Sequence, residues 1–543
     1  MHGVALFCMI PDPALPFFDP VFTDAAWPHV ALVLRWGVLV LGAVVVFRLV
    51  RTPEASGGSG KGGRFPRIFV PLAVVCLVAI AGRQAGWQLF GRRNPQFVEF
   101  MQRYDRREFN PAHRVRAGKI LDRNGRVLAV SRVTESGVRR FYPYGPVFSH
   151  VIGYNHPVYG LSGLESAARE RLLGRELRNT RQWAELGREL LDRETYAEGP
   201  HLRTTLDLAL QRRAWELLGN RRGAVVVLEV ESGAVRALVS RPEFDPNRLY
   251  SGVFEGRTGE APLLNRALAG QYPPGSVFKV LVAAAALRAN FQGTLDTPPE
   301  GFTTSPANPP IRDHEYYSAK RKGQSWRGRG QIDLSEALVH SSNVFFARLG
   351  VRIGAEPLER AVQAMGWNQP IPLSRNTEAT LLASPARLPD LRDDRPYDIA
   401  QFSIGQGEVL VSPLQIAMLC AAVAREGVVV APRLDAEAPV RPLGRLCSVE
   451  EAETLKWMMY KVVQEGTGRG IRIRELPVAG KTGTAQTGGD RPSHSWFAGF
   501  TPVSRPQWAF CVLVEHGGYG SSAALPVARE LLQTALDRGE LSP

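Results

Sequence analysis

Three short motifs in the second half of the chain could together perform acyl transfer. A serine and a lysine stand three positions apart at 276–279 (SVFK), two serines precede an asparagine at 341–343 (SSN), and residues 481–483 read KTG. In a helix, residues i and i+3 share one face, so the Lys279 amine is expected to reach the Ser276 hydroxyl. Serine is a useful nucleophile only when a neighbouring base takes its proton. The spacing therefore predicts a serine nucleophile with a lysine base.

The predicted base needs an unusual environment. A lysine accepts a proton near neutral pH only when desolvation or a second cation lowers its pKa. Lys481 lies on a predicted strand and could supply that cation. The start of a helix also exposes backbone N–H groups that favour negative charge developing beside Ser276. The alternative for Ser276 alone is an ordinary helix N-cap, the commonest use of serine at such a position.

The three motifs differ in specificity. The chain has only eight lysines, so K-T-G is expected by chance roughly 0.03 times and S-x-x-K about 0.4 times. S-x-N is a weak pattern, and it occurs again at 374–376 (SRN). Residues 341–343 join two helix-like stretches, whereas the second match follows Ile371-Pro372 and leads into no apolar helix. We therefore assign the motif to 341–343.

The elements around these motifs predict an α+β domain. Two strands joined by a Ser-Gly turn are expected at 223–240, and three more near the end of the chain (PVAGKTGTAQ, SWFAGFTP and QWAFCVLVEHGG). Between them lie helical patterns, one opening at Ser276 and one at 412–427, and an amphipathic helix follows the last strand. Five short strands would lack partners unless the early and late strands join one sheet.

The N-terminal region, 1–91, is predicted to be a membrane anchor. Apolar stretches at about 27–47 and 68–90 are each near the length of a membrane helix, although Arg35 and Arg83 interrupt them. The linker between them is basic, and the residues before the first stretch contain aspartates but no lysine or arginine. The positive-inside rule then places the linker in the cytoplasm and the rest of the chain outside. One span plus an interfacial helix is the alternative.

Two further domains are predicted, a spacer at 92–200 and a larger catalytic domain at 201–543. In the spacer, Asn124-Gly125 between alternating apolar residues predicts a hairpin. Residues 160–178 predict a turn leading into an amphipathic helix. The net charge of +14 comes from scattered arginines with no basic stripe between aromatics, which argues against nucleic acid binding and favours a surface facing anionic lipid or wall polymer.

The cysteines, two histidines and residues 313–315 are not assigned to catalysis or metal binding. The five cysteines show no metal-like or disulfide-like spacing and are predicted to be buried thiols where they fall in apolar runs. His340 and His494 flank motifs but lack an acid partner at suggestive spacing, so both are taken as structural. Residues 313–315 (DHE) are expected to be solvated on a loop rather than to bind a metal. We expect no metal and no cofactor.

The chain resembles a class B penicillin-binding protein, the peptidoglycan D,D-transpeptidase family of the β-lactamase/transpeptidase-like superfamily. The resemblance covers nearly everything after about residue 92 and rests on these phrases: RAGKILDRNGRVLA, GLSGLE, LNRALAGQYPPGSVFK, HSSNVFF, SIGQGEVLVSPLQIA, VAGKTGTAQ and HSWFAGF. It implies a transpeptidase domain with an antiparallel sheet of about five strands flanked by helices, a small pedestal-like spacer and a membrane anchor. The family usually has one anchor helix, whereas this chain has two candidates.

The resemblance implies a catalytic role for five residues. Ser276 would attack the carbonyl between the last two D-alanines of a stem peptide. Lys279 would be the base, although base assignment in this superfamily is disputed. Ser341 would relay a proton to the leaving group, with Asn343 holding the lysine and the substrate amide. Lys481 would assist catalysis and help to bind the substrate's terminal carboxylate.

The same resemblance assigns substrate binding to the K-T-G strand. Thr482 and Thr484 would bind the terminal carboxylate, on either side of Gly483. The backbone N–H groups of Ser276 and Thr484 would form the oxyanion hole. For the two threonines, the alternative is that they are ordinary strand residues.

The expected partners are peptidoglycan stem peptides, β-lactams and the membrane. A further expected partner is a multi-span glycan polymerase of the shape, elongation, division and sporulation (SEDS) family, because no glycosyltransferase domain is predicted before residue 92. The expected location is the bacterial plasma membrane with the catalytic domain on its outer face. Three alternatives use the same fold: a membrane β-lactam sensor, a hydrolase of the D,D-carboxypeptidase or β-lactamase type, and a catalytically silent scaffold. Turnover of a D-Ala-D-Ala peptide with an amine acceptor would separate them.

Overall fold

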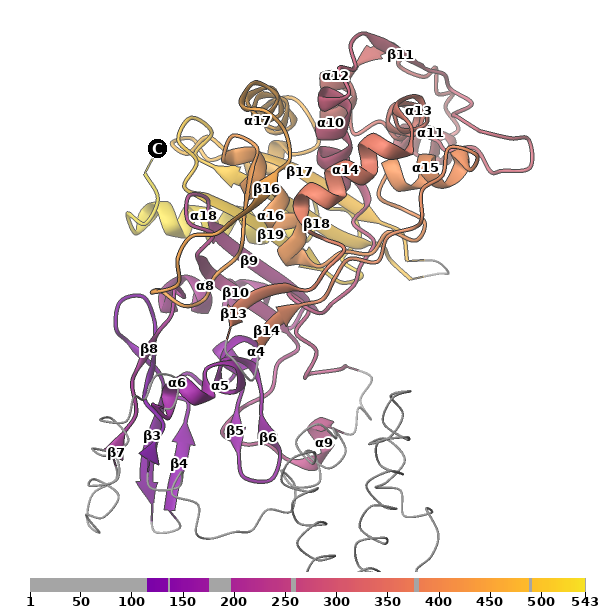
Figure 1. Cartoon of the computed structure of the whole chain (residues 1–543). Coiled ribbons are helices and arrows are strands. Elements are labelled where there is room, and N and C mark those ends of the chain that lie inside the picture. Colours follow the sequence, from indigo (N-terminus) through magenta and orange to yellow (C-terminus); the bar gives the residue numbers. More distant parts are fainter. Residues whose placement is uncertain are drawn as a thin grey trace, which may run out of the picture. The chain divides into compact units, whose positions relative to one another are not determined.

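The structure is a computed structural model that describes residues 115–134, 137–174, 197–254, 260–375, 380–487 and 491–542 (Figure 1). By backbone contacts, nearly all of these residues belong to one compact unit, Phe109–His156 with Leu161–Pro543. Within the described ranges, no helix is both long enough and apolar enough to cross a membrane. The two predicted membrane helices, at 27–47 and 68–90, lie outside the described residues.

A five-stranded antiparallel sheet forms the centre of this unit (Figure 1). Its order is β10-β9-β19-β18-β17, with the strands at Gly223–Glu229 (β9), Val235–Arg241 (β10), Ala479–Ala485 (β17), His494–Thr501 (β18) and Trp508–Val514 (β19). Strand β19 pairs with β9 along its whole length, which joins the early strands to the late ones. The prediction that both sets of strands meet in one antiparallel sheet is confirmed.

Helices cover both faces of the sheet, so the strands are buried on both sides. Val225 and Val227 of β9 pack in one core with Leu210 and Leu531. These two leucines lie on α8 (Leu208–Leu218) and α18 (Ala524–Asp537). Val226 faces the other core, which contains α10 (Lys279–Arg288) and α16 (Pro413–Ala424). A strand buried on both faces reads as a continuous apolar run, as GAVVVLE does.

The predicted helix at 412–427 is confirmed as α16, which is buried nearly all round and is therefore apolar on every side. Ser412 caps it by accepting a hydrogen bond from Gln415 N, and the Gln415 side chain accepts one from Ser412 N. Cys420 on this helix, Cys447 and Cys511 are buried free thiols, as expected.

The remaining elements of the catalytic region form a helical lobe and small sheets. The helices are α9 (Ser251–Phe254), α11 (His314–Arg321), α12 (Leu334–His340), α13 (Asn343–Ile353), α14 (Ala355–Met365), α15 (Pro396–Ser403), α17 (Val449–Gln464) and the 3-10 turns η5 (Gly275–Phe278) and η6 (Arg469–Ile471). Three antiparallel pairs are β11 (Thr294–Thr297) with β12 (Gly330–Asp333), β13 (Ile371–Arg375) with β14 (Thr380–Ala383), and β15 (Val428–Val430) with β16 (Pro442–Arg445).

The described part of the spacer, and the strand β8 that follows it directly, are short elements. They are β1 (Val115–Arg116), β2 (Ile120–Leu121), β3 (Val127–Thr134), β4 (Gly137–Phe141), η4 (Gly145–Phe148), α4 (Ser149–Ile152), β5 (Asn155–His156), β6 (Gly160–Leu161), α5 (Gly163–Ala167), α6 (Arg169–Leu172), β7 (Ala197–Glu198) and β8 (Leu202–Arg203). The predicted hairpin is confirmed: β2 and β3 pair antiparallel around Asn124-Gly125, where Gly125 has a φ of 85°. The predicted amphipathic helix is instead two short helices, α5 and α6.

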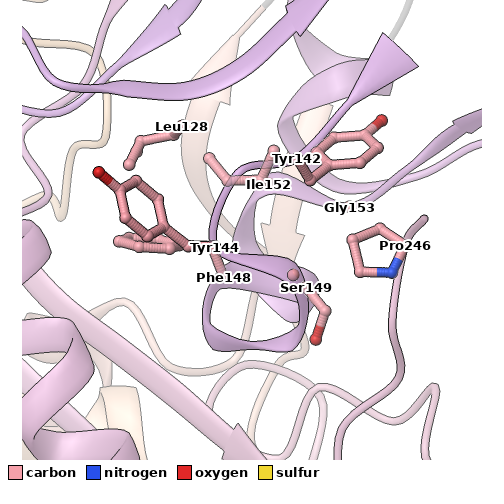
Figure 2. A pocket seen from close by; sticks show the side chains of 9 residues that line it. Leu128, Tyr142, Tyr144, Phe148, Ser149, Ile152, Gly153 and Pro246 are labelled. Carbon is pink, nitrogen blue, oxygen red and sulfur yellow. The ribbon is translucent and has the colours of Figure 1, made fainter. Parts of the chain in front are cut away.

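The spacer contains a buried ion pair and a small apolar hollow. Arg140 on β4 forms a buried ion pair with Glu165 on α5, with Nε 2.7 Å from Oε1. A small hollow nearby is lined by apolar and aromatic side chains, including Leu128, Tyr142 and Phe148, with Pro246 at its edge (Figure 2). None of its lining residues belongs to the three motifs, so we regard it as a packing feature of the spacer.

Candidate active site

Ser276 lies on the turn η5, which continues directly into α10 at Lys279. The sequence predicts a helix opening at Ser276, and the structure begins the turn one residue earlier, at Gly275. The N-cap residue is Pro274, and no side chain caps the turn, so Ser276 is not an N-cap. Gly275 has a φ of 55°, and a Cβ there would lie 2.6 Å from the Thr484 carbonyl oxygen. Glycine thus allows the serine turn to pack against β17.

Lys279 is fully buried, and its hydrogen bonds point toward the second motif. Nζ donates to the Ser341 carbonyl oxygen and to Asn343 Oδ1, each at 2.7 Å. Among the described residues it makes no hydrogen bond to Ser276 Oγ, so the predicted direct contact is absent in this resting state. Burial lowers the pKa of Lys279 to about 7, although the carboxylates of Asp313 and Glu315 oppose that shift. An amine with this pKa can serve as a base at neutral pH.

Ser341 lies between the two lysines of the site. It follows α12 in a left-handed conformation, with a φ of 60° and a ψ of 36°, which is uncommon for a residue other than glycine and often marks a functional site. Its carbonyl oxygen accepts from Lys279, and its Oγ accepts from Lys481 Nζ at 2.8 Å. The turn between α12 and α13 therefore presents one serine to both amines.

Lys481 is buried on β17, where its side chain is only 1% exposed. Burial holds its pKa well below the usual value for a lysine, and the charge of Lys279 lowers it further. The predicted role of Lys481 as the cation that lowers the pKa of Lys279 is not seen: burial lowers the pKa of Lys279, and it is the charge of Lys279 that acts on Lys481. Ser341 links the two lysines through its two oxygens. Two desolvated amines this close disfavour a state in which both carry a charge.

The remaining K-T-G residues continue along β17, which is an edge strand of the sheet. Thr484 Oγ1 accepts from Gly520 N at 3.3 Å, and Thr482 Oγ1 is 2.7 Å from Thr467 Oγ1. A Cβ on Gly483 would lie 2.9 Å from Val277 Cγ1, so glycine is needed for η5 to reach the strand. The predicted carboxylate and oxyanion sites on this strand remain predictions.

Asp313 is a site residue that sequence reasoning missed. The expectation that 313–315 is solvated is wrong for this residue, whose side chain is only 3% exposed. Asp313 Oδ1 accepts from Asn343 N at 2.5 Å and from Val344 N at 3.0 Å, and Ser342 Oγ donates to both carboxylate oxygens. It thus fixes the start of α13, where Asn343 lies. No local sequence pattern identifies this contact, because the partners are about thirty residues apart.

A second missed residue is Glu515, which holds the loop before Ser276. Its Oε1 accepts from Arg266 Nε at 2.7 Å and from Tyr272 Oη at 2.6 Å. The Tyr272 ring packs edge-on against Trp496, whose Nε1 donates to the Pro273 carbonyl oxygen at 3.1 Å. The loop that ends at the nucleophile is therefore fixed to β18 and to the end of β19.

The residues interpreted as structural lie apart from the catalytic hydrogen bonds. His494 Nδ1 accepts from His516 N at 3.1 Å, and burial lowers the pKa of His494 to about 4, so it is neutral at pH 7. Ser374 of the second S-x-N match lies in β13, opposite Leu381, and Asn376 falls outside the described residues. Across the described ranges, no three potential metal ligands come together.

Comparison with known proteins decides the family. Residues 223–533 match the penicillin binding protein transpeptidase domain, and residues 117–194 match the penicillin binding protein A dimerisation domain. The chain belongs to the penicillin-binding protein transpeptidase family. The resemblance inferred from the motifs is thereby confirmed.

Sequence alignments with named relatives cover most of this chain. The peptidoglycan D,D-transpeptidase PbpA of Mycolicibacterium smegmatis is 31% identical over 455 residues, which cover 76% of this chain and 88% of the relative. MrdA of Acinetobacter baumannii, also a peptidoglycan D,D-transpeptidase, is 30% identical to this chain. The alignment covers 72% of this chain and 65% of MrdA. Penicillin-binding protein A from M. tuberculosis, solved as a ceftriaxone acyl-enzyme complex, has a TM-score of 0.69 and 29% identity, with coverage of 78% of this chain and 99% of that chain.

Proposed function

We propose that this protein is a peptidoglycan D,D-transpeptidase that cross-links stem peptides through an acyl-enzyme on Ser276, and that β-lactams inhibit it by forming a stable ester there. The observation that carries the proposal is the convergence on one serine of two buried lysines from distant segments. Lys279, which lies one turn after the nucleophile, donates to the Ser341 carbonyl oxygen, and Lys481 donates to the Ser341 hydroxyl. The two aligned relatives share the activity in their names, which supports the same reading.

In the first half of the reaction, neutral Lys279 takes the Ser276 proton as Oγ attacks the carbonyl carbon of the D-Ala-D-Ala amide. The backbone N–H groups of Ser276 and Thr484 stabilise the resulting oxyanion. The C–N bond then breaks, and the leaving amine receives a proton from Ser341 Oγ. Lys481, which donates to that hydroxyl, restores the Ser341 proton. Free D-alanine departs and an ester remains on Ser276.

In the second half, an amine of a neighbouring stem peptide attacks this ester. A new amide bond forms, the ester C–O bond breaks, and Ser276 Oγ regains a proton from the attacking amine through the same lysines. Thr482 and Thr484 on the edge strand bind the terminal carboxylate of the donor before acylation, and Asn343 holds both Lys279 and the donor amide. Because β17 is an edge strand, an extended peptide can lie alongside it.

Intact-protein mass spectrometry after exposure to penicillin tests the nucleophile. The wild type should gain one penicillin per chain, on the peptide that contains Ser276. Ser276→Ala should gain none while unfolding at nearly the same denaturant concentration, because Ser276 caps no helix. An adduct that persists in Ser276→Ala would falsify the assignment.

Lys279→Arg tests the base. Arginine keeps a positive charge but does not act as a base at neutral pH, so acylation should slow by about 10²–10⁴-fold, the usual cost of losing a general base. A loss of less than about tenfold would assign the base elsewhere. Turnover of a D-Ala-D-Ala peptide with and without an amine acceptor then separates transpeptidation from hydrolysis, from a sensor that acylates once, and from a silent scaffold.

We further propose that residues 1–91 anchor the enzyme in the bacterial plasma membrane with its catalytic domain on the outer face. The charge asymmetry around the two apolar stretches supports this topology. Single cysteines at Ala14 and Ser56, in a variant with Cys8 and Cys76 replaced by serine, report it. A thiol reagent confined to the outside should label position 14 and not 56, and the reverse pattern would overturn the topology.

The proposed partner is a multi-span SEDS-family glycan polymerase that supplies the strands to be cross-linked. The motifs account for cross-linking chemistry and leave glycan polymerisation to another protein. Arg35, deep in the first apolar stretch, is a candidate contact because a charge there is costly in lipid. Wild type and Arg35→Leu should differ in their recovery with the polymerase from mild detergent. Equal recovery would reject the contact.

A further inference from the structure

From residue 316 in α11 to residue 332 in β12, the chain carries positive charge without a matching negative charge. Residues 316–332 contain five basic residues and no aspartate or glutamate. Four of these basic residues are exposed and form no ion pair with another described residue. We call these four side chains the basic arm: Lys320, Arg321, Lys322 and Arg327. Like charges this close in sequence repel one another, so the arm gains from an anionic partner.

Both ends of the arm are fixed to the catalytic cluster. At the N-terminal end, α11 begins at His314, directly after Asp313, whose carboxylate binds the start of α13. At the C-terminal end, Arg329 forms an ion pair with Glu315. Strand β12 then leads into α12, and α12 ends at His340, directly before Ser341. A polymer bound to the arm is therefore held beside the turn that presents Ser341.

The charges of this region also act on the catalytic residues themselves. The carboxylate of Glu315 raises the pKa of Lys279, and Arg329 helps to lower the pKa of His340. Such effects require the base of the arm to lie near the site, which agrees with the contacts of Asp313 and Arg329. The residues that flank the arm on both sides therefore lie near the active site.

The chemical nature of the arm's partner can be inferred from how little a single exposed ion pair contributes to binding. One solvent-exposed ion pair contributes only about 0–1 kcal/mol, so a surface of four separate cations binds well only to a polymer with repeated negative charges. Long, flexible lysine and arginine side chains suit carboxylates at variable spacing. If the proposed function holds, the polymer that carries the substrate of Ser276 is itself of this kind, because stem peptides bear carboxylates along the strand.

We propose that the basic arm is a docking surface for peptidoglycan strands whose stem peptides carry free carboxylates. This deepens the proposed function and rests on it. Binding at the arm keeps a strand close to Ser276 after each encounter, which raises the local concentration of its other stem peptides. The arm contributes affinity for the polymer, whereas the K-T-G strand selects the peptide terminus.

The test measures binding of the full-length protein, in detergent, to purified sacculi from which phosphodiester polymers have been stripped. The variant Lys320→Gln, Arg321→Gln, Lys322→Gln and Arg327→Gln removes four charges. A matched control removes four exposed basic residues that form no ion pair in the described ranges: Arg126→Gln, Arg352→Gln, Arg441→Gln and Arg505→Gln. Penicillin acylation should stay within about twofold of wild type in both variants, because the substituted side chains touch no catalytic group.

Wild type and control should bind stripped sacculi with similar affinity, and that affinity should fall as salt rises. The arm variant should bind about tenfold more weakly at low salt, since each exposed pair contributes modestly. Converting sacculus carboxylates to amides should abolish the difference between arm variant and wild type. Equal binding by the two quadruple variants would overturn the proposal. So would a difference seen only with unstripped sacculi, which would assign the arm to a phosphate polymer. Failure of the proposed function would instead appear as the absence of a penicillin adduct on wild type.

Discussion

Two segments deliver the two serines of the active site, and they are stabilised in different ways. The loop before Ser276 is held by a charge-balanced network, in which Glu515 binds Arg266 at 2.7 Å and Arg222 at 2.9 Å. The turn at 341–343 is held by Asp313, which accepts hydrogen bonds from two backbone N–H groups and a hydroxyl, with no ion pair among the described residues.

The difference separates a purely structural anchor from one that also adjusts the chemistry. Arginine side chains neutralise the negative charge of Glu515, so this charge has little electrostatic effect on Lys279 and Lys481. In the described ranges no basic side chain forms an ion pair with Asp313, and its charge raises the pKa of Lys279 against the effect of burial. Asp313 therefore sets both the position of Asn343 and the proton affinity of the base. Four substitutions test this contrast.

Glu515→Gln should give the largest effect, on stability. Arg266 is fully buried and would lose its charged partner, and breaking a buried ion pair typically costs about 3–5 kcal/mol. Urea unfolding should show a loss of that size in the free energy of unfolding. Arg222→Gln is the control: its side chain is 43% exposed, and it should cost less than about 1 kcal/mol. A comparable loss in both variants would contradict the buried network.

Asp313→Asn should lower the free energy of unfolding less than Glu515→Gln does, but it should slow acylation more. The amide keeps the shape of the side chain and weakens charge-assisted hydrogen bonds, which are worth about 1.5–3 kcal/mol. We expect the free energy of unfolding to fall by about 2 kcal/mol and penicillin acylation to slow at least tenfold, since Asn343 and Ser341 shift. The exposed Asp390→Asn serves as control and should change neither quantity.

The pH profile of acylation should separate the two anchors. The base is the neutral form of Lys279, so the acylation rate should rise with pH through about 7. Asp313→Asn and Glu315→Gln each remove a negative charge that stabilises the ammonium, so the pKa of Lys279 should fall and the rise should move to lower pH. Glu515→Gln should leave the midpoint unchanged. A midpoint that none of these variants moves would mean that another group titrates.

Tyr272→Phe should have the smallest effect. It removes one hydrogen bond to Glu515, which keeps both arginines, and the expected cost is about 1 kcal/mol. Thermal unfolding should detect it, and acylation should change less than about threefold. If Tyr272→Phe costs more than Glu515→Gln, the hydroxyl rather than the ion pair is the main anchor of the nucleophile loop.

Local features could be predicted from the sequence because their causes lie within a few residues. The strands at 223–240 follow from apolar runs around a turn, the hairpin at Asn124-Gly125 from turn chemistry, and the helix at 412–427 from its apolar pattern and its capping serine. The family follows from the motifs, since each is short and their order is specific. These predictions need no knowledge of which distant segments meet.

Only the tertiary structure decided which groups fix the site. The Ser276–Lys279 spacing predicts a direct contact, yet Lys279 binds Ser341 and Asn343, because packing of α10 against the turn between α12 and α13 places two acceptors nearer. Glu515 meets Arg266 across 249 residues because β19 pairs with β9 and the loop before Ser276 packs on that sheet. A buried charge must find a partner wherever the fold supplies one, and the sequence holds no periodic signal for a partner that far away.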